Sequence, residues 1–384
     1  MKSYRKRILL DASNALGVGA KIVIKNIISV IPKLSIDNHF IALLPDIEYY
    51  KSIPEYENLE LIFLKQNSFR LVKRLFHLSF GLHNWLRVNR IDICFTLGDI
   101  GPIKMNIPHF VLLHQAYIVA DAYDHISDLN ILSKIKLVLI KIYFSRMIIN
   151  LDAIFVQTPK MAEGLIDIYH LKKGKIFIIP QAIPQHIQTP QYFHHVEEKV
   201  TRFTSKGYVC FLFLGAAYEH KNHRVLPSVI KILKNRGIRN YKIIITLEMG
   251  LSKYESDTLM TLLKFKENIY NIGRIKPVEV ASVLKQCDAL FMPSTLESFG
   301  LIYIEAMSFN KPILASDRDF VHWICGDGIE YFEPNEPISI ADSIEKFIRF
   351  GPDESYFEDY NKALASFPQS WSEVVAQYVN VMIE

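Results

Sequence analysis

Short apolar runs alternate with helix-like segments along the whole chain, and this alternation limits the fold more than any other feature of the sequence. In the first half the runs occupy residues 7–10, 39–44, 59–64, 91–96, 109–114, 153–157 and 175–180. In the second half they occupy residues 208–214, 242–246, 269–272, 289–292 and 312–315. Strands that alternate with helices form parallel sheets covered on both faces. The sequence therefore predicts an α/β protein with doubly wound, Rossmann-like sheets.

The length of 384 residues exceeds what one ordinary hydrophobic core can organise, so two domains are expected. A polar segment that contains proline and histidine breaks the alternation after the seventh run. We therefore predict an N-terminal Rossmann-like domain over residues 1–185, a linker over 186–207 and a second Rossmann-like domain over 208–366. A final helix within residues 367–384 is expected to pack back toward the N-terminal domain. The simplest architecture has the two domains facing each other across a cleft.

The charge of the chain is unevenly distributed. Residues 1–185 contain 23 Lys and Arg against 15 Asp and Glu, whereas the remainder contains 21 against 25. A basic N-terminal half favours an anionic partner, which could be a phosphorylated ligand, an acidic membrane or a nucleic acid. The sequence contains no nucleic-acid-binding signature, so nucleic acid is the least favoured of the three.

Cysteine usage and hydropathy indicate the compartment. The four cysteines are scattered without a paired spacing, which is typical of small core residues in a reduced cytosol. The first apolar run ends at Asp11, too early for a signal peptide. No segment reaches the roughly 18 consecutive apolar residues that a membrane helix needs. We therefore expect a cytoplasmic protein.

Residues 293–307, PSTLESFGLIYIEAM, place two carboxylates around a glycine turn and the start of a helix. Backbone N–H groups at a helix N-terminus favour anions, and Gly300 would let a phosphate approach closely. Glu297 before the helix and Glu305 two turns into it could each accept hydrogen bonds from the paired hydroxyls of a sugar or a ribose. The other interpretation is that Glu297 caps the helix while Glu305 is a solvated helix residue, and the residues alone leave both open.

The same stretch resembles the Glu-x7-Glu motif of the retaining glycosyltransferase family 4, which has the GT-B fold. The similarity continues through residues 269–274, 311–317 and 330–334, is strong over 208–350 and is weaker before that. The resemblance implies that Glu297 contacts the transferred sugar and that Glu305 binds the ribose of a nucleotide-sugar donor. It implies that the turn between them holds the diphosphate, through Ser298, Phe299, Gly300 and Leu301.

Residues 213–222, FLGAAYEHKN, resemble the strand and loop in which this family uses an Arg and a Lys to neutralise the leaving diphosphate. Gly215 and Lys221 match that pattern, but Ala216 stands where the family has the Arg. Either His220 or Arg274 supplies the missing positive charge, or one cation is sufficient. The alternative for Lys221 is an ordinary solvated lysine.

Two further features of the N-terminal half have counterparts in the family. Gly17-Val-Gly19 follows the first strand and resembles the glycine loop at which acceptor and donor phosphate approach, although a plain turn explains it nearly as well. A third glycine is missing, so a dinucleotide site is excluded. His114 ends a strand and resembles the family's donor-facing histidine; the alternative is a buried core histidine.

Residues 70–80 have the pattern of a basic amphipathic helix, with Arg70, Lys73, Arg74 and His77 on one side. Such a helix could lie on an anionic membrane, or it could be an ordinary surface helix. The Asp-x-Asp form at Asp317 falls in a turn after a strand, so we interpret it as structural. We expect neither a metal nor a cofactor.

The resemblance implies a retaining, metal-independent GT-B hexosyltransferase that uses a UDP-, GDP- or dTDP-linked sugar. Its expected acceptor is a growing, lipid-linked bacterial polysaccharide such as O-antigen or capsule, reached from the cytoplasmic face of the inner membrane. A GT-B sugar-nucleotide epimerase is one alternative. A non-catalytic sugar-nucleotide-binding subunit is another, which the missing Arg at Ala216 keeps open.

Overall fold

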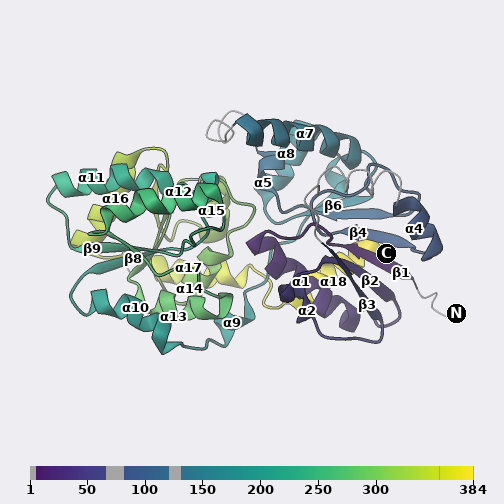
Figure 1. The fold of residues 1–384 in the computed structure, drawn as a ribbon, viewed down its shortest axis with the longest axis horizontal. Helices are drawn as coiled ribbons and strands as arrows, with labels where there is room; N and C mark the ends of the chain where they lie inside the picture. Colours follow the sequence, from purple (N-terminus) through teal and green to yellow (C-terminus); the bar gives the residue numbers. More distant parts are fainter. Residues whose placement is uncertain (1–5, 66–81, 121–130, 354, 384) are drawn as a thin grey trace. The chain divides into compact units, whose positions relative to one another are not determined.

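A computed structural model describes residues 6–65, 82–120, 131–353 and 355–383. The chain forms two compact units. Unit 1 comprises residues 1–182 and 368–384, and unit 2 comprises residues 183–367. Each unit is a parallel sheet with helices on both faces (Figure 1). The prediction of an α/β protein with two doubly wound sheets is confirmed.

The sheet of unit 1 has seven strands in the order β3-β2-β1-β4-β5-β6-β7, and every neighbouring pair is parallel. Each of the seven apolar runs in the first half forms one strand. The strands are β1 (Arg7–Asp11), β2 (His39–Pro45), β3 (Leu59–Leu64), β4 (Ile93–Thr96), β5 (His109–Leu112), β6 (Ala153–Val156) and β7 (Ile176–Ile178). Most of their side chains are buried, because helices cover both faces of the sheet.

The described helices of unit 1 are α1 (Val18–Leu34), α2 (Glu48–Lys51), α4 (Leu82–Val88), α5 (Ala116–Val119), α7 (Ile131–Ile148), α8 (Pro159–Tyr169) and α18 (Trp371–Ile383). The last of these comes from the C-terminus and packs against α1. Its Tyr378 ring lies 5.5 Å from the ring of Phe95 and 4.9 Å from that of Phe155, measured between centroids. The final helix therefore completes the core of unit 1.

The sheet of unit 2 has six strands in the order β10-β9-β8-β11-β12-β13, again all parallel. Five of them are the predicted runs, and the sixth, at the edge, was not predicted as a strand. The strands are β8 (Val209–Phe213), β9 (Tyr241–Ile245), β10 (Ile269–Asn271), β11 (Ala289–Met292), β12 (Ile313–Ser316) and β13 (Glu330–Phe332).

The first two α-helices of unit 2, α9 (Gln185–Gln188) and α10 (His194–Thr204), come from the segment predicted as a linker. The described α-helices that follow them in unit 2 are α11 (Leu226–Asn235), α12 (Lys253–Leu262), α13 (Val280–Gln286), α14 (Leu301–Ser308), α15 (Asp319–Cys325), α16 (Pro337–Phe350) and α17 (Tyr356–Ala365). Val196 and Val200 of α10 are buried in the core of unit 2. The backbone N–H of Phe193 donates a hydrogen bond to Ser282 Oγ at 2.8 Å. Residues 186–207 are thus packed structure of unit 2 and not a free linker. The sequence suggested a linker because these helices are mostly polar, so their two buried valines gave little hydrophobic signal.

The strand order locates the edges at which ligands are expected. In unit 2 the chain leaves β8 toward β9 on one side and later returns to β11 on the other side. In unit 1 it leaves β1 toward β2 and returns to β4. Open α/β sheets bind ligands outside the carboxyl ends of the strands at such reversals. The segments after β8 and β11, and those after β1 and β4, are therefore the places to examine.

Two predictions concern membranes and cysteines. The predicted basic helix at residues 70–80 lies outside the described residues. No helix among the described residues has both the length and the apolar composition needed to cross a bilayer. All four cysteines are buried and unbridged, at Cys94, Cys210, Cys287 and Cys325.

Candidate functional site

A largely buried ion pair lies at the carboxyl ends of β8 and β11. After β8 the chain makes a short 3-10 turn, Glu219–Lys221, and after β11 it forms the loop that contains Glu297. Lys221 Nζ lies 2.5 Å from Glu297 Oε1. The two side chains are only 15% and 13% exposed. Lys221 is therefore not a solvated lysine, and both charges are held at the reversal of strand order.

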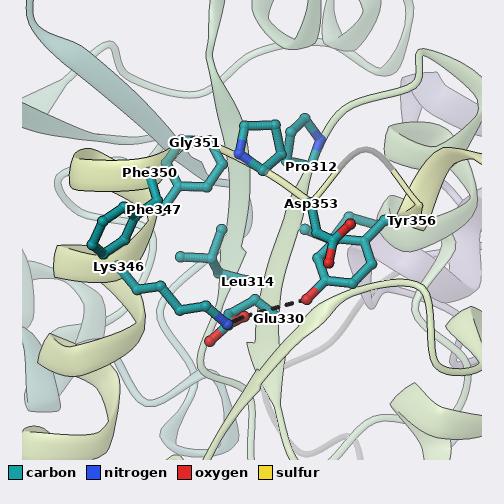
Figure 2. Close-up of a pocket in the computed structure, with 11 residues that line it drawn as sticks. Pro312, Leu314, Glu330, Lys346, Phe347, Phe350, Gly351, Asp353 and Tyr356 are labelled. Atoms are coloured by element: carbon teal, nitrogen blue, oxygen red, sulfur yellow. Dashed lines mark hydrogen bonds and ion pairs between the residues drawn. The ribbon is translucent and has the colours of Figure 1, made fainter.

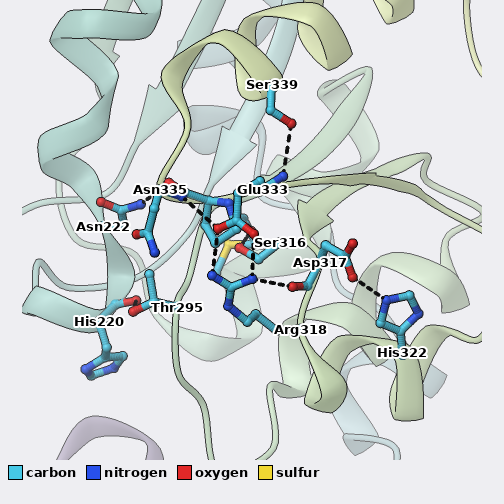
Figure 3. A network of polar contacts seen from close by, with 12 residues as sticks. His220, Asn222, Thr295, Ser316, Asp317, Arg318, His322, Glu333, Asn335 and Ser339 are labelled. Atoms are coloured by element: carbon cyan, nitrogen blue, oxygen red, sulfur yellow. Dashed lines mark hydrogen bonds and ion pairs between the residues drawn. The ribbon is translucent and has the colours of Figure 1, made fainter. Parts of the chain in front are cut away.

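Backbone hydrogen bonds join the loops that carry this pair. The N–H of Thr295 donates to the carbonyl oxygen of His220 at 2.8 Å. Asn222 adopts a left-handed conformation with a φ of 58°, and its Nδ2 donates to the carbonyl oxygen of Pro334 at 2.7 Å. The N–H of Gly215 donates to Thr246 Oγ1 at 3.1 Å. Loops after β8, β9, β11 and β13 are thus fastened together, in part as Figure 3 shows.

Gly300 precedes α14 in a conformation that favours glycine. Its φ is 101°, and a Cβ atom built there would lie 2.7 Å from the ring of Tyr303. Glycine is thus required both by the backbone and by the close approach of Tyr303. Phe299 is buried and packs edge-on against Trp323 and Phe367. The turn before α14 is therefore fixed by packing, and it presents the start of the helix at the carboxyl edge of the sheet.

The environment of Glu297 favours its ionised form. Burial by itself would raise the pKa of this carboxyl, but the charges of Lys221 and His220 and the hydrogen bond from Lys221 outweigh burial, so its pKa is lowered. Glu297 is consequently a carboxylate at neutral pH.

Glu305 is a buried residue of α14 and not a solvated one. It is 7% exposed, and its Oε1 lies 3.1 Å from Nε2 of His186 in α9. Burial raises the pKa of Glu305, and the neighbouring His186 opposes that shift. Nothing in the sequence pattern indicated His186, since it lies in the segment predicted as a linker.

His220 and Arg274, the two residues that could replace the missing Arg at Ala216, have different surroundings. The charge of His220 contributes to the lowered pKa of Glu297, and its ring stacks on Tyr218 with 5.6 Å between centroids. Arg274 instead forms an ion pair with Glu248, with 3.1 Å between Nη1 and Oε2, and both side chains are nearly half exposed. His220 therefore belongs with the buried pair, whereas Arg274 is held by a surface carboxylate.

Gly17 and Gly19 lie at the N-terminus of α1, directly after β1 in unit 1. Both are exposed. Among the described residues, no atom beyond its chain neighbours and its own helix lies within 4 Å of the place where a Cβ atom on Gly19 would be. The protein's own packing therefore does not explain a glycine at position 19, and the space in front of it is open.

His114 follows β5, next to the loop after β4. Its backbone N–H donates to Asp99 Oδ1 at 2.6 Å, and the N–H of Gln115 donates to the same oxygen at 3.0 Å. Asp99 has a φ of 65°, a strained conformation for a non-glycine residue. Burial lowers the pKa of His114, opposed by Asp99, so the ring is neutral. Its Nε2 is buried and has no hydrogen-bond partner within the part of the chain that the structure describes.

His109 shows what a purely structural histidine looks like in the same sheet. Its Nε2 lies 3.0 Å from Thr96 Oγ1, and burial lowers its pKa to about 4. His114 differs in having a buried ring nitrogen for which the described residues provide no hydrogen-bond partner. A buried polar atom without a partner calls for an explanation, and a ligand contact is one of several; His223, whose two ring nitrogens are also unsatisfied within the described part of the chain, shares the property.

The Asp-x-Asp turn after β12 is engaged in structural contacts. Arg318 forms a bidentate pair with Glu333 at 3.0 and 2.7 Å, and His322 Nε2 lies 2.7 Å from Asp317 Oδ1 (Figure 3). Among the described residues, no group of three or more His, Cys, Asp or Glu side chains is arranged to hold a metal ion.

A cavity of about 260 Å³ lies elsewhere in unit 2 (Figure 2). It is lined by Pro312 and Glu330, which stand at or just before the start of β12 and β13, and by the ion pair of Lys346 with Glu330, 2.6 Å apart. It therefore opens at the amino ends of the strands, the edge opposite the buried ion pair. Parallel sheets do not place ligands at that edge, so we assign the cavity no role.

Solved structures share the fold of this chain. WaaG, a glycosyltransferase involved in lipopolysaccharide biosynthesis, superposes with a TM-score of 0.74 over 98% of this chain and 99% of that chain, at 12% identity. Anabaena HepE in complex with UDP-glucose superposes with a TM-score of 0.71 over 97% of this chain and 99% of that chain, at 14% identity. At such identities the likeness concerns the fold alone. The chain has the two-unit α/β fold of the GT-B glycosyltransferases.

The family is indicated by unit 2. Residues 197–364 match the family described as glycosyl transferases group 1, and this match includes the Lys221–Glu297 pair. O-antigen chain mannosyltransferase RfbU of Salmonella typhimurium is 25% identical over 152 residues, which are 39% of this chain and 41% of that protein. O-antigen chain mannosyltransferase B of Escherichia coli is 26% identical over 180 residues, 46% of this chain and 45% of that protein. The chain thus spans less than half the length of these curated relatives in the matched regions.

Proposed function

We propose that this protein is a retaining glycosyltransferase that moves a hexose-type sugar from a nucleotide-diphosphate donor to a saccharide acceptor. The observation that carries the proposal is the buried Lys221–Glu297 pair at the carboxyl edge of unit 2. It lies at the reversal of strand order, beside the left-handed Gly300 turn and within the group 1 segment. A buried ion pair is costly to maintain, so its position at a ligand-binding edge supports a functional role.

The reaction needs stabilisation of a departing diphosphate. As the bond between the anomeric carbon and the phosphate oxygen breaks, the electron pair passes to the diphosphate. The ammonium of Lys221 and the N-terminus of α14 supply fixed positive potential for that charge. The hydroxyl oxygen of the acceptor bonds to the same face of the anomeric carbon, and its proton passes to the leaving phosphate oxygen. Retention by this route requires no protein nucleophile.

Glu297 has the properties of a residue that binds the transferred sugar. Its lowered pKa keeps it ionised, and an ionised carboxylate accepts hydrogen bonds from sugar hydroxyls. Glu305 is assigned to the ribose of the donor. It lies in the same helix that Gly300 precedes, so sugar and ribose contacts flank the turn proposed to hold the diphosphate.

Two features of unit 1 support roles for its candidate residues. The open space at Gly19 is suited to the approach of an acceptor or a donor phosphate. The unsatisfied Nε2 of His114 is suited to a hydrogen bond with the donor sugar. We assign Gly17, Gly19 and His114 these roles within unit 1.

The substrate class follows from the relatives. The UDP-glucose complex of HepE supports a UDP-linked donor, with GDP- and dTDP-linked sugars as the alternatives. The relatives named as O-antigen mannosyltransferases support an acceptor that belongs to a bacterial surface polysaccharide. We propose a lipid-linked saccharide acceptor at the cytoplasmic face of the inner membrane, and we propose that neither a metal nor a cofactor takes part.

A thermal-shift screen with UDP-, GDP- and dTDP-sugars tests the proposal first, because a tight donor raises the melting temperature by mass action. Incubation with the radiolabelled donor then separates the possible activities. Transfer of label to a lipid-linked acceptor supports the proposal, whereas an epimerised nucleotide sugar, or binding without turnover, contradicts it. Activity is expected to survive EDTA; loss of activity that Mn²⁺ restores would contradict the metal-independent mechanism.

A further inference from the structure

Helix α7 exposes an apolar face that the described residues of its unit leave uncovered. We define this α7 outer face by six side chains that are between 45% and 79% exposed: Ile131, Leu132, Ile135, Val138, Leu139 and Ile142. At 100° per residue all six fall on one side of the helix. Figure 1 shows α7 along the outer edge of unit 1.

The opposite side of α7 is also apolar, and it is the side that packs. Leu137, Phe144, Met147 and Ile148 are buried, and the last three join the core cluster that contains Met161 and Leu165 of α8. A helix that is hydrophobic all round is normally buried all round. Here one side is buried in unit 1 and the other is exposed, so within the part of the chain that the structure describes no element packs on the outer face.

The charges of α7 are of one sign. Between residues 131 and 148 there are three lysines and one arginine, at Lys134, Lys136, Lys141 and Arg146, and no Asp or Glu. On the helical projection Lys134 and Lys141 lie along one margin of the outer face and Lys136 lies beyond the other. Arg146 lies on that face toward its C-terminal end, where it is exposed.

We propose that the α7 outer face docks the protein on an anionic lipid bilayer. Aliphatic side chains at the centre would enter the boundary between headgroups and acyl chains, and the flanking cations would meet anionic headgroups. Four cations within 18 residues prevent the helix from crossing the bilayer, but they suit a helix that lies in its surface.

Charge favours a bilayer over a second copy of the chain as the occupant of this face. If α7 packed against α7 of another copy about a two-fold axis, like charges would be brought together without a carboxylate from either helix. An anionic membrane instead complements the positive charges that Lys136 and Arg146 bring to this side of the helix. This inference stands on α7 alone and does not depend on the proposed glycosyl transfer.

Flotation with lipid vesicles tests the proposal. The full chain is expected to float with phosphatidylcholine vesicles that contain phosphatidylglycerol, and much less with phosphatidylcholine alone. The triple variant Ile135→Ser/Leu139→Ser/Ile142→Ser should bind at least about tenfold more weakly, since three aliphatic side chains no longer enter the bilayer. The double variant Lys136→Gln/Arg146→Gln should bind roughly 25-fold more weakly at low salt, at about fivefold for each charge lost.

The matched control removes three exposed aliphatic side chains elsewhere, in Ile36→Ser/Val88→Ser/Ile338→Ser, whose native side chains are 71%, 70% and 58% exposed. This variant should float like the parent. Circular dichroism and melting temperature show that each variant is folded, and donor binding to unit 2 should be unchanged in all of them.

Three results would overturn the proposal. The first is a parent protein that does not float with anionic vesicles, or that floats equally well with neutral ones. The second is an α7 triple variant that floats like the parent. If flotation is instead abolished only by Arg70→Glu/Lys73→Glu/Arg74→Glu, residues 70–80 and not α7 bind the membrane. The third is a parent protein that sediments as a dimer while the α7 triple variant sediments as a monomer and floats like the parent. The outer face would then bind a second copy of the chain.

Discussion

Nε2 of His186 lies 3.1 Å from Oε1 of Glu305, although 119 residues separate them in the chain. The two side chains are 18% and 9% exposed, so the contact is largely shielded from water. It ties the short helix α9, which opens unit 2, to the helix that carries the proposed ribose ligand. A carboxyl group in such surroundings, at the edge where ligands are expected, fits the donor contact that we propose for Glu305.

Glu305→Gln is expected to stabilise the protein at neutral pH. Burial raises the pKa of Glu305, so its ionised form costs the native state free energy above the usual carboxyl range. That cost vanishes below about pH 4, where the carboxyl is protonated in both the folded and the unfolded state. The gain in melting temperature should therefore be present at pH 7 and shrink as the pH falls. Glu57→Gln, at an exposed position, should change little at either pH. A lower melting temperature for Glu305→Gln at pH 7 would show that the contact with His186 stabilises the fold on balance.

The same substitution is expected to weaken nucleotide binding. If Glu305 accepts hydrogen bonds from the ribose hydroxyls, loss of its charge removes contacts of about 1.5–3 kcal/mol, equivalent to roughly a tenfold to hundredfold increase in Kd. Calorimetry with the nucleoside diphosphate measures this. Glu305→Gln would then be more stable and bind less tightly, whereas unchanged affinity would remove Glu305 from the donor site.

Substitutions of the buried pair should affect turnover more than the fold. Glu297→Gln is expected to lower turnover by roughly 10²-fold or more, about 3 kcal/mol of transition-state binding. Lys221→Ala should cost on the order of 10²–10³-fold through loss of one preorganised electrostatic contact. Lys206→Ala changes an exposed lysine of unit 2 and should leave turnover unchanged. Equal effects at Lys206 and Lys221 would exclude Lys221 from the site.

The pH dependence of stability should distinguish Glu297 from Glu305. The lowered pKa of Glu297 means that its carboxylate stabilises the folded state above the usual carboxyl range, and that this stabilisation is lost as the pH falls through its folded-state pKa. Glu297→Gln should thus destabilise the protein at pH 7, with the deficit shrinking in acid. That is opposite in sign to the effect of Glu305→Gln, and melting curves of both variants at several pH values measure it. Shifts of the same sign would contradict the different environments found for the two carboxylates.

The elements that sequence reasoning predicted are those that local pattern determines. The apolar runs in both halves form strands. A strand covered by helices on both faces buries all its side chains, so its sequence is continuously apolar and does not alternate with polar residues. The glycine before α14 could be anticipated, since its left-handed backbone is a local property. β13, at Glu330–Phe332, is a three-residue edge strand in which only Phe332 is buried, so it carries little periodic signal.

What the sequence could not supply are contacts between distant segments. His186 reaches Glu305 only because α9 packs beside α14, and Arg274 is drawn to Glu248 by the fold of neighbouring loops. The outer face of α7 was also hidden: with apolar residues on both sides, the sequence does not reveal which side the unit leaves uncovered. Only the packing of Phe144, Met147 and Ile148 settles that.

Substitution of Gly19 should change stability and activity in opposite directions, and substitution of Gly215 provides the comparison. Gly19 is in the first turn of α1, and no described residue outside that turn lies within 4 Å of a built Cβ atom, so Gly19→Ala should stabilise the helix by about 0.5–1 kcal/mol. The added methyl group would occupy the space proposed for the approaching acceptor or donor phosphate, so kcat/KM should fall at least about tenfold. Gly215 is the matched contrast: its φ of 137° suits only glycine, so Gly215→Ala should cost about 1–3 kcal/mol of stability. Melting curves and initial rates on both variants separate the two roles. A Gly19→Ala variant that is more stable and fully active would show that the glycine loop after β1 is a plain turn.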